Sequence, residues 1–369
     1  MIDKLEKIFI PLAEKIGKNR YLLAIRDGFL LTTPLLIIGS FFLLVANFPI
    51  PNWVEFWAKF FGDNWTSYMS KPTNATFDIM AIFAVIGIAY SFSRELNVDK
   101  LSGAAVALVS WFILMPYSVT DGNVTLPGIP LGWIGSKGIF VGIITAFISV
   151  HIYAFVKKKG WMIKMPEGVP PAVTQSFEAL VPSAVVLTIF FLINILFSLT
   201  PYGNAFDFIF KCLQGPLQSL GSTVGAVLIA MGFQHVFWFF GINGGSIVGS
   251  IMQPILTPLS MENLAAYQAG NPLPHVINQQ FYDLFTTFGG AGSTLSMVIA
   301  MVLFCKSKRI KDLSRISFAP ALFGINEPII FGLPIVLNPM ILIPFLLTPL
   351  INILVSYFVM LSGLVPFCS

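Results

Sequence analysis

Long apolar stretches without any charged side chain dominate the pattern of this sequence. Three of them cover residues 28–54, 179–206 and 328–369. Because about 20 consecutive apolar residues suffice to cross the hydrocarbon core of a bilayer, each stretch is long enough to span a membrane. The pattern therefore predicts a protein that lies within the bilayer.

In the first part of the chain, the apolar stretches alternate with short polar connections. Residues 50–69 are rich in Trp, Phe and Tyr, which collect where membrane meets water, so we expect an external interfacial segment there. Residues 164–180 contain three prolines and predict a cytoplasmic connection with a short surface helix. The expected spans cover residues 28–48, 77–92, 103–117, 139–156 and 180–199.

Beyond residue 220, glycine and proline interrupt the apolar stretches at what should be membrane depth. Irregular backbone is tolerated there only where protein or a water-filled cavity satisfies its polar groups. In transporters such interruptions commonly form the substrate site, although a kinked packing helix is the alternative at each place. The interrupting residues are Gly241, Gly244, Gly245, Gly249, Pro254 and Pro258 in one region and Pro320, Pro328, Pro334 and Pro339 in the other.

Together these features predict an all-α polytopic membrane protein. We expect about 8–10 transmembrane helices, with re-entrant hairpins and broken helices in the C-terminal half. Residues 1–220 are expected to form an amphipathic N-terminal segment and a scaffold domain of about five spans. Residues 221–369 are expected to form a transport domain that carries the substrate site.

Composition and charge agree with this organisation. Hydrophobic residues make up 56% of the chain, charged residues 10%, and the mean hydropathy is +0.83, whereas a soluble domain carries roughly 25% charged residues. Lysine and arginine clusters next to spans mark cytoplasmic loops, so the positions of these clusters predict a cytoplasmic N-terminus. The net charge of +4 is therefore not interpreted as a nucleic-acid surface. Seventeen of the 21 lysines and arginines fall within residues 1–26, 94–100, 157–164 and 306–315.

Several classes of site are excluded by what the sequence lacks. Cys212, Cys305 and Cys368 share no metal-ligand spacing and no CxxC motif, so we expect no disulfide framework, redox centre, metal site or cofactor. The basic N-terminus leads into a full-length span and not into a short apolar core with a cleavage site, so no cleavable signal is expected. We find no nucleophile–base pairing or phosphate loop of a soluble enzyme.

Glu327 is the most informative polar residue of the C-terminal half. It stands among apolar residues, and no lysine or arginine follows Arg315. Because an unpartnered carboxylate is costly outside water, its partner must be distant in sequence or be a ligand. A carboxylate next to the amide of Asn326 suits a sugar, whose hydroxyls both groups can bind while rings such as Trp238 and Phe240 cover its apolar faces. A proton-coupled carboxylate is the competing interpretation.

Other candidate residues lie near the interruptions. The sequence FGIN occurs at 240–243 and again at 323–326, which predicts similar local geometry at Asn243 and Asn326. His235 lies eight residues before Asn243, so on one helix the two side chains share a face about 12 Å apart. A neutral histidine that bonds to a neighbouring helix is the alternative. Gly289, Gly290 and Gly292 would let backbone N–H groups approach a ligand, or would serve helix packing.

Several longer motifs together resemble a known family. They read IRDGFLLTTPLLIIGSFFLL, GSKGIFVGIITAFISVHIY, FWFFGINGGSIV, FYDLFTTFGGAGSTLSM and FAPALFGINEPIIFGLPIVLNP. With them the chain resembles, over nearly its whole length, the EIIC permeases of the bacterial phosphoenolpyruvate:sugar phosphotransferase system (PTS), in the lactose, cellobiose and diacetylchitobiose group. The last motif is the most specific of the five.

The resemblance implies a mode of action. It implies a multi-pass protein of the bacterial cytoplasmic membrane that forms a homodimer through its N-terminal helices. The C-terminal domain would carry one disaccharide in an elevator-like movement, and phosphorylated EIIB, a separate chain supplied by EIIA, would phosphorylate the sugar on the inside. Whether this chain counts as an enzyme stays open, because phosphoryl transfer needs EIIB.

The resemblance also implies roles for residues. Glu327 matches the family's sugar-binding glutamate. We assign Glu327 and His235 to the expected catalytic residues. Asn326 is expected to shape the turn that carries Glu327. Many relatives have a histidine where this chain has Asn243, which leaves open whether His235 or Asn243 contacts the sugar. Trp238, Asn243 and the glycines Gly289, Gly290 and Gly292 complete the expected substrate-binding set.

Two alternatives to this function remain. One is an ion-coupled secondary sugar transporter in which Glu327 titrates, and the other is an inactive permease. Relatives continue beyond the LSGLVP region, so we expect this chain to be shortened at its C-terminus. Among disaccharides, cellobiose or another β-glucoside is expected, although single side chains decide between related sugars.

Overall fold

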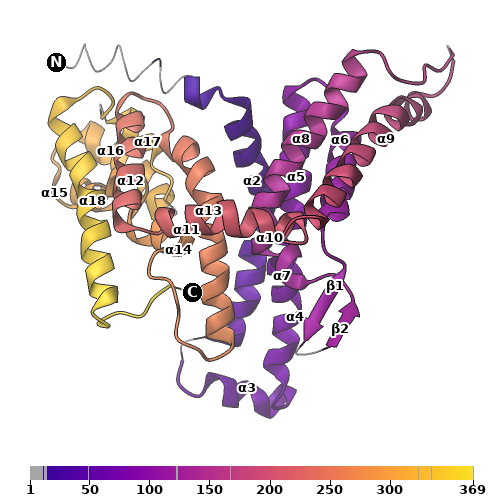
Figure 1. The fold of residues 1–369 in the computed structure, drawn as a ribbon. Coiled ribbons are helices and arrows are strands. Elements are labelled where there is room, and N and C mark those ends of the chain that lie inside the picture. The colour runs from indigo at the N-terminus through magenta and orange to yellow at the C-terminus, as the bar shows by residue number, and fades with distance from the viewer. Residues whose placement is uncertain are drawn as a thin grey trace. The chain divides into compact units, whose positions relative to one another are not determined.

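The computed structural model describes residues 11, 15–48, 50–121, 124–166, 168–322, 324–333 and 335–368. Most of the predicted amphipathic N-terminal segment lies outside these residues, as do Phe323 and Pro334. Apart from one short β-hairpin, the regular structure of the described chain is helical, which confirms the predicted all-α class (Figure 1). By its contacts the chain divides into unit 1, which joins Met1–Leu22 to Pro216–Ser369, and unit 2, which is Leu23–Gly215. The scaffold and transport roles assigned to residues 1–220 and 221–369 stay predictions.

Unit 2 is a bundle of apolar helices around large buried rings. Its helices α5, α6 and α8 pack against one another, and α9 packs on α6 and α8. Phe92, Trp111 and Tyr153 are fully buried among them. The helices are α2 (Arg20–Ala46, which begins in unit 1), α3 (Trp53–Phe61), α4 (Trp65–Phe77), α5 (Met80–Glu95), α6 (Lys100–Leu114), α7 (Leu131–Ile134), η1 (Ser136–Gly138), α8 (Ile139–Lys158), α9 (Pro171–Ser198), α10 (Ala205–Ile209) and η2 (Phe210–Gln214).

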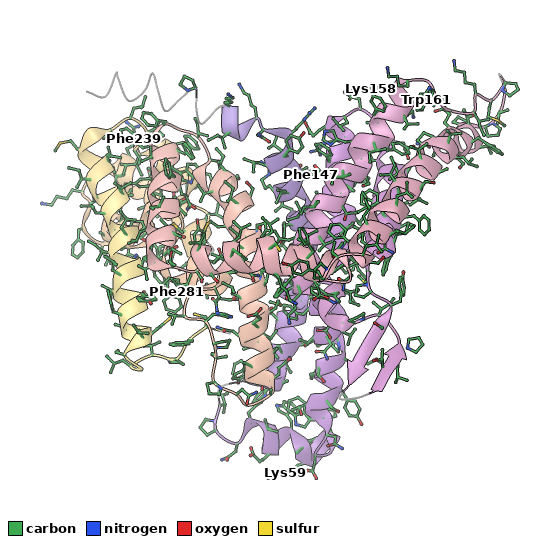
Figure 2. The ribbon with its side chains drawn as sticks, viewed as in Figure 1. Lys59, Phe147, Lys158, Trp161, Phe239 and Phe281 are labelled. Carbon is green, nitrogen blue, oxygen red and sulfur yellow. The ribbon has the colours of Figure 1, made fainter. Side chains whose placement is uncertain are left out.

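The two ends of unit 2 differ in character. At one end lies the aromatic-rich α3 with Lys59. At the other lie Lys158, the last residue of α8, and Trp161, which follows that helix (Figures 1 and 2). The indole N–H of Trp53 donates to the Val45 carbonyl at 2.7 Å and fixes α3 to the end of α2. A β-hairpin that the sequence did not predict, β1 (Ser118–Asp121) and β2 (Val124–Pro127), pairs antiparallel with Ser118 opposite Pro127.

The predicted membrane spans are found close to their expected positions. By length and composition, five described helices could cross a membrane. A sixth results if residues Ala205–Gly221, which end in α11 (Gly215–Gly221), and α12 (Val224–Phe239), bent by 76°, are parts of one broken span. Two further apolar helices, Lys100–Leu114 and Ala291–Phe304, are shorter than these, so the described residues provide five or six candidate spans where 8–10 were predicted. The expected short surface helix before residue 180 is wrong, because α9 runs unbroken from Pro171. Proline is well suited to this first helical position, where a missing N–H leaves no bond unmade.

Unit 1 contains two hydrophobic clusters. One is formed by α12, α13 and α14 with α18, and includes Met231, Leu256 and Phe281. The other surrounds Trp238 and Phe345. The described elements after α12 are α13 (Gly244–Gln268), α14 (Gln279–Phe285), η3 (Ala291–Ser293), α15 (Leu295–Phe304), α16 (Lys308–Leu322), α17 (Glu327–Gly332) and α18 (Pro339–Leu361).

The predicted break between α12 and α13 occurs at residues 240–243, but the helix then continues through both prolines of this region. Pro254 and Pro258 lie inside α13 and are buried. Each proline removes one backbone hydrogen bond. The surrounding protein keeps the rest of the helix in place, so proline alone was a poor indicator of a helix end here.

Candidate functional site

A tight turn of residues 289–294, called here the glycine hairpin, forms the centre of the candidate site. Gly290 has φ +95°, and a Cβ there would lie 2.6 Å from both the Asn326 Cγ and the Gly324 carbonyl oxygen. Gly292 has φ +75°, and a Cβ there would lie 2.1 Å from the Phe345 ring. Glycine is required at both places, since neither the left-handed backbone nor the space accommodates a side chain.

His235 holds the glycine hairpin against α12. The side chain is fully buried. Its Nε2 accepts a hydrogen bond from the Gly292 N–H at 2.8 Å, so its Nδ1 carries the proton and donates to the Met231 carbonyl at 2.7 Å. The Phe345 ring packs edge-on at 5.3 Å between centroids. Both ring nitrogens are therefore engaged within the protein, and a sugar contact at His235 would require one bond to break.

Asn326 ties the second FGIN turn to the same hairpin. Its side chain is buried, and its Nδ2 donates to the Ala291 carbonyl at 2.5 Å and to the Thr294 hydroxyl at 2.9 Å. Thr294 in turn donates to the Gly289 carbonyl at 3.1 Å. The residue that follows, Glu327, is therefore placed by a chain of hydrogen bonds that begins at His235.

The Glu327 carboxylate is left without a partner by this arrangement. Glu327 is half-buried at the first position of α17. Within the described residues, no hydrogen bond or ion pair reaches its carboxylate, and none links it to His235. The protein thus fixes the backbone of Glu327 firmly while its acceptor oxygens remain available to a ligand.

Trp238 and Asn243 lie together at the break between α12 and α13. A Cβ built on Gly245 would lie 3.5 Å from the Asn243 Oδ1 and 3.8 Å from the Trp238 Nε1. Trp238 also belongs to the cluster that contains Ile329 and Ile330 of α17. The Leu337 N–H donates to the Phe239 carbonyl at 2.9 Å, so this turn is fastened to the segment after α17.

The two FGIN turns share the geometry that their sequence predicts. Gly241 and Gly324 have φ +78° and +77°, and Asn243 and Asn326 each directly precede a helix. Their side chains differ, however. The exposed Asn243 caps α13 by accepting a bond from the Ser246 N–H at 2.9 Å, whereas the buried Asn326 donates to the hairpin. Only Asn243 keeps an amide N–H₂ that other described residues leave unused.

The eight predicted site residues thus all lie in unit 1, around one hairpin and two turns. Sequence reasoning missed Thr294 and Phe345, which support Asn326 and His235. A further histidine, His275, is engaged elsewhere: its Nε2 lies 2.7 Å from the Glu262 carboxylate, and its backbone N–H donates to the Asn263 Oδ1. A contact between separate turns leaves no periodic signal in a single sequence, so these supports could not have been found there.

Known proteins are similar to this chain over almost its full length. The family described as "Phosphotransferase system, EIIC" matches residues 26–349. The lichenan permease IIC component of Bacillus subtilis (strain 168) is 42% identical over 368 residues, which are 98% of this chain and 81% of that protein. The cellobiose-specific EIIC component of Geobacillus stearothermophilus is 42% identical over 374 residues, with 99% and 83% covered.

A solved structure is similar as well. The crystal structure of ChbC, the IIC component of the N,N'-diacetylchitobiose-specific phosphotransferase system, superimposes with a TM-score of 0.95. Sequence identity is 45%, and the match covers 98% of this chain and 86% of ChbC. Both the sequence match and the fold therefore lead to one assignment: this chain is a membrane-embedded protein that belongs to the EIIC family of the phosphotransferase system.

Proposed function

We propose that this chain is the sugar-translocating EIIC subunit that imports a β-linked disaccharide, with cellobiose as the preferred substrate. The single observation that carries the proposal is the Glu327 carboxylate, which is positioned by the glycine hairpin and left without a protein partner. The names of the similar proteins, specific for lichenan, cellobiose and N,N'-diacetylchitobiose, support a substrate with β-linked sugar units.

The groups around the hairpin suit a sugar chemically. A carboxylate accepts hydrogen bonds from two neighbouring hydroxyls, and the Asn243 amide can donate to a third oxygen. Trp238 offers an indole ring for the apolar face of a pyranose. The Glu327 carboxylate would bind the hydroxyl that is to be phosphorylated, and His235 would act by holding the hairpin.

The proposal includes partners and an orientation. A separate, phosphorylated EIIB, itself supplied by EIIA, would phosphorylate the sugar on the cytoplasmic side and so retain it by its charge. The N-terminus would lie in the cytoplasm of the bacterial cell, as the clusters of lysine and arginine suggest. The chain would act as a homodimer in which the sugar-binding part moves in an elevator-like manner.

Uptake into right-side-out membrane vesicles tests this function. Vesicles that contain this chain, loaded with or without phosphorylated EIIB, are given labelled cellobiose, lactose or diacetylchitobiose. We expect cellobiose to accumulate as its phosphate only when EIIB is present. In Glu327→Gln uptake should fall about 10- to 100-fold, since hydrogen bonds to a charged group contribute about 1.5–3 kcal/mol.

A matched variant makes the result specific. Glu262→Gln changes another glutamate of unit 1 in the same way, but that carboxylate already pairs with His275, so uptake should be retained. Uptake of unmodified sugar that follows an imposed pH gradient would replace the proposal with ion coupling through Glu327. Absence of any sugar uptake or binding would identify an inactive permease.

A further inference from the structure

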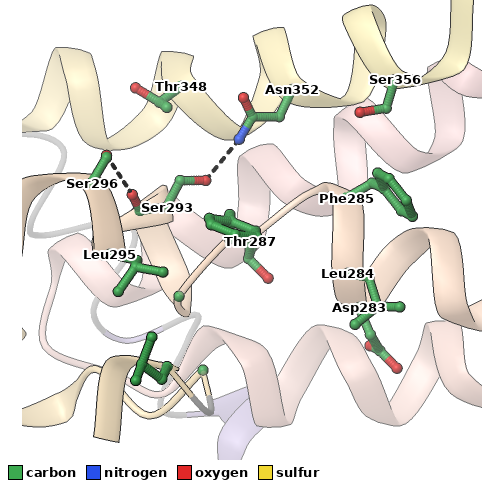
Figure 3. A pocket seen from close by; sticks show the side chains of 14 residues that line it. Asp283, Leu284, Phe285, Thr287, Ser293, Leu295, Ser296, Thr348, Asn352 and Ser356 are labelled. Carbon is green, nitrogen blue, oxygen red and sulfur yellow. Dashed lines mark hydrogen bonds between the residues drawn. The ribbon is translucent and has the colours of Figure 1, made fainter. Parts of the chain in front are cut away.

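A cavity with several polar side chains in its lining lies within unit 1 and does not include Glu327. Its volume is about 860 Å³, within the range of small-molecule sites. Figure 3 shows its lining, which we call the α18 pocket. The lining residues are Asp283, Leu284, Phe285, Thr287, Phe288, Gly289, Ser293, Leu295, Ser296, Leu322, Gly324, Thr348, Asn352 and Ser356.

One wall of the α18 pocket is a polar stripe on an apolar helix. Thr348, Asn352 and Ser356 follow one another at intervals of four residues and therefore share a face of α18 (Figure 3). The Asn352 amide N–H donates to the Ser293 hydroxyl at 2.9 Å. Within the described residues, its Oδ1 has no partner. Such a stripe on a membrane helix requires something polar opposite it.

The two hydroxyl groups of this stripe make no hydrogen bond to described residues. Serine and threonine in apolar helices ordinarily donate to a carbonyl one turn earlier, as Thr188 does to Ala184 and Ser362 does to Val359. Thr348 and Ser356 make no such bond, nor does any other described residue accept from them. Their hydroxyls are thus available to a molecule in the cavity.

Asp283 supplies the charge of the pocket. Both of its carboxylate oxygens accept from the Gln279 amide, at 3.0 and 3.1 Å, which leaves further acceptor positions on each oxygen. The Asp283 side chain is exposed, so its carboxylate can be reached by a molecule in the cavity. Asp283 is the one ionisable side chain in the described lining.

These groups define a class of ligand. A carboxylate, an amide oxygen and the two free hydroxyls of Thr348 and Ser356 suit a molecule with many hydroxyl groups, and the rings of Phe285 and Phe288 suit the C–H face of a pyranose. An anion would be repelled by Asp283. An acyl chain would leave the polar stripe unpaired, which is costly.

We propose that the α18 pocket is a second binding site for a neutral sugar, in which Asp283 and Asn352 bind hydroxyl groups. The site rests on the proposed sugar function, because it would hold the same class of substrate next to the glycine hairpin. Gly289, Ser293 and Gly324 belong both to the pocket lining and to the turns that place Glu327. A sugar bound here would therefore lie beside the segments that form the first site.

Photo-crosslinking with a cellobiose that carries a diazirine tests the proposal on the full chain in detergent. Adducts are located by peptide mass spectrometry, and excess cellobiose serves as competitor. We expect competed adducts within residues 284–288 and 348–356, which belong to the pocket alone. Asp283→Asn, which keeps the shape and one acceptor, and Asn352→Leu should each lower these adducts about tenfold while adducts at residues 238–243 persist.

Two further variants separate this site from the first. In Glu327→Gln the adducts at 238–243 should fall and those of the pocket should persist. Ser362→Ala, directly after the same helix and outside the pocket, should change neither set. The proposal is overturned if pocket adducts are absent, are not competed, or are unchanged in both pocket variants. Loss of the EIIB-dependent uptake with pocket adducts intact would overturn only the proposed function.

Discussion

At the scale of single residues, the predicted catalytic side chain of His235 makes two hydrogen bonds within the protein. Its position in the sequence suggested a histidine that faces a ligand. In the folded chain its two nitrogens connect Met231 of α12 to Gly292 of the glycine hairpin. Because the hairpin in turn holds Asn326, His235 helps to position Glu327, and a direct contact of His235 with a sugar stays a prediction.

Replacing His235 tests this supporting role. In His235→Leu the Gly292 N–H loses its acceptor while remaining buried, which should destabilise the protein by about 1–3 kcal/mol and lower the midpoint of thermal unfolding in detergent. His235→Gln keeps an acceptor of similar reach and should recover part of the loss. Equal midpoints for the Leu and Gln variants would show that the bond to Gly292 contributes nothing.

At the scale of elements, glycine sets the distance between α2 and α5. A Cβ on Gly87 would lie 2.7 Å from the Gly28 carbonyl oxygen, and one on Gly28 would lie 2.7 Å from the Ile88 nitrogen. Two turns further along α5, Arg94 pairs with Asp27 at 2.6 Å. Close backbone contact and the ion pair therefore hold the same crossing.

Gly87→Ala should disrupt this crossing. The obstacle to the new methyl group is backbone, which cannot rotate away, so we expect a loss of about 1–3 kcal/mol, seen as a lower midpoint of thermal unfolding. Gly232→Ala is the matched control, because it lies within apolar α12 and a Cβ there meets nothing within 4 Å. It should be neutral or stabilise by up to about 1 kcal/mol. If Gly87→Ala leaves the midpoint of thermal unfolding as high as Gly232→Ala does, the packing described here is contradicted.

The sequence predicted elements better than it predicted contacts. Apolar length placed the spans, and α8 (Ile139–Lys158) begins at the expected residue. The helix interruption predicted at Pro254 is wrong, because the burial of α13 outweighs the loss of one hydrogen bond. The FGIN repeat predicted two similar turns correctly, since the left-handed glycine is a local property. The α18 pocket was missed, although the spacing of Thr348, Asn352 and Ser356 could have revealed its polar face.

At the scale of the whole molecule, the predicted orientation assigns the two ends of unit 2 to opposite sides of the membrane. Gly62 follows α3 at one end, and Gly160 follows α8 in the lysine cluster at the other (Figure 1). Both glycines are exposed, and neither has an atom within 4 Å of an added Cβ. Short insertions at these two places should therefore leave the fold intact.

Protease recognition sites inserted at Gly62 and Gly160 test the orientation. If the lysine cluster is cytoplasmic, the site at Gly160 should be cleaved in inside-out vesicles and spared in right-side-out vesicles. The site at Gly62 should show the reverse. Cleavage of both sites in the same kind of vesicle would contradict the arrangement, whereas an exchange of the two results would invert the orientation.

The full engagement of His235 also limits how protons can be handled. An amide at Asn243 takes up no proton, and neither nitrogen of His235 is free to do so. If the proposed function holds, a proton released by a sugar hydroxyl bound at the described hairpin would therefore pass only to the Glu327 carboxylate or to water. Any general base for phosphoryl transfer would then be Glu327 itself or a group brought by the incoming donor, and the proton would leave along a path without a relay.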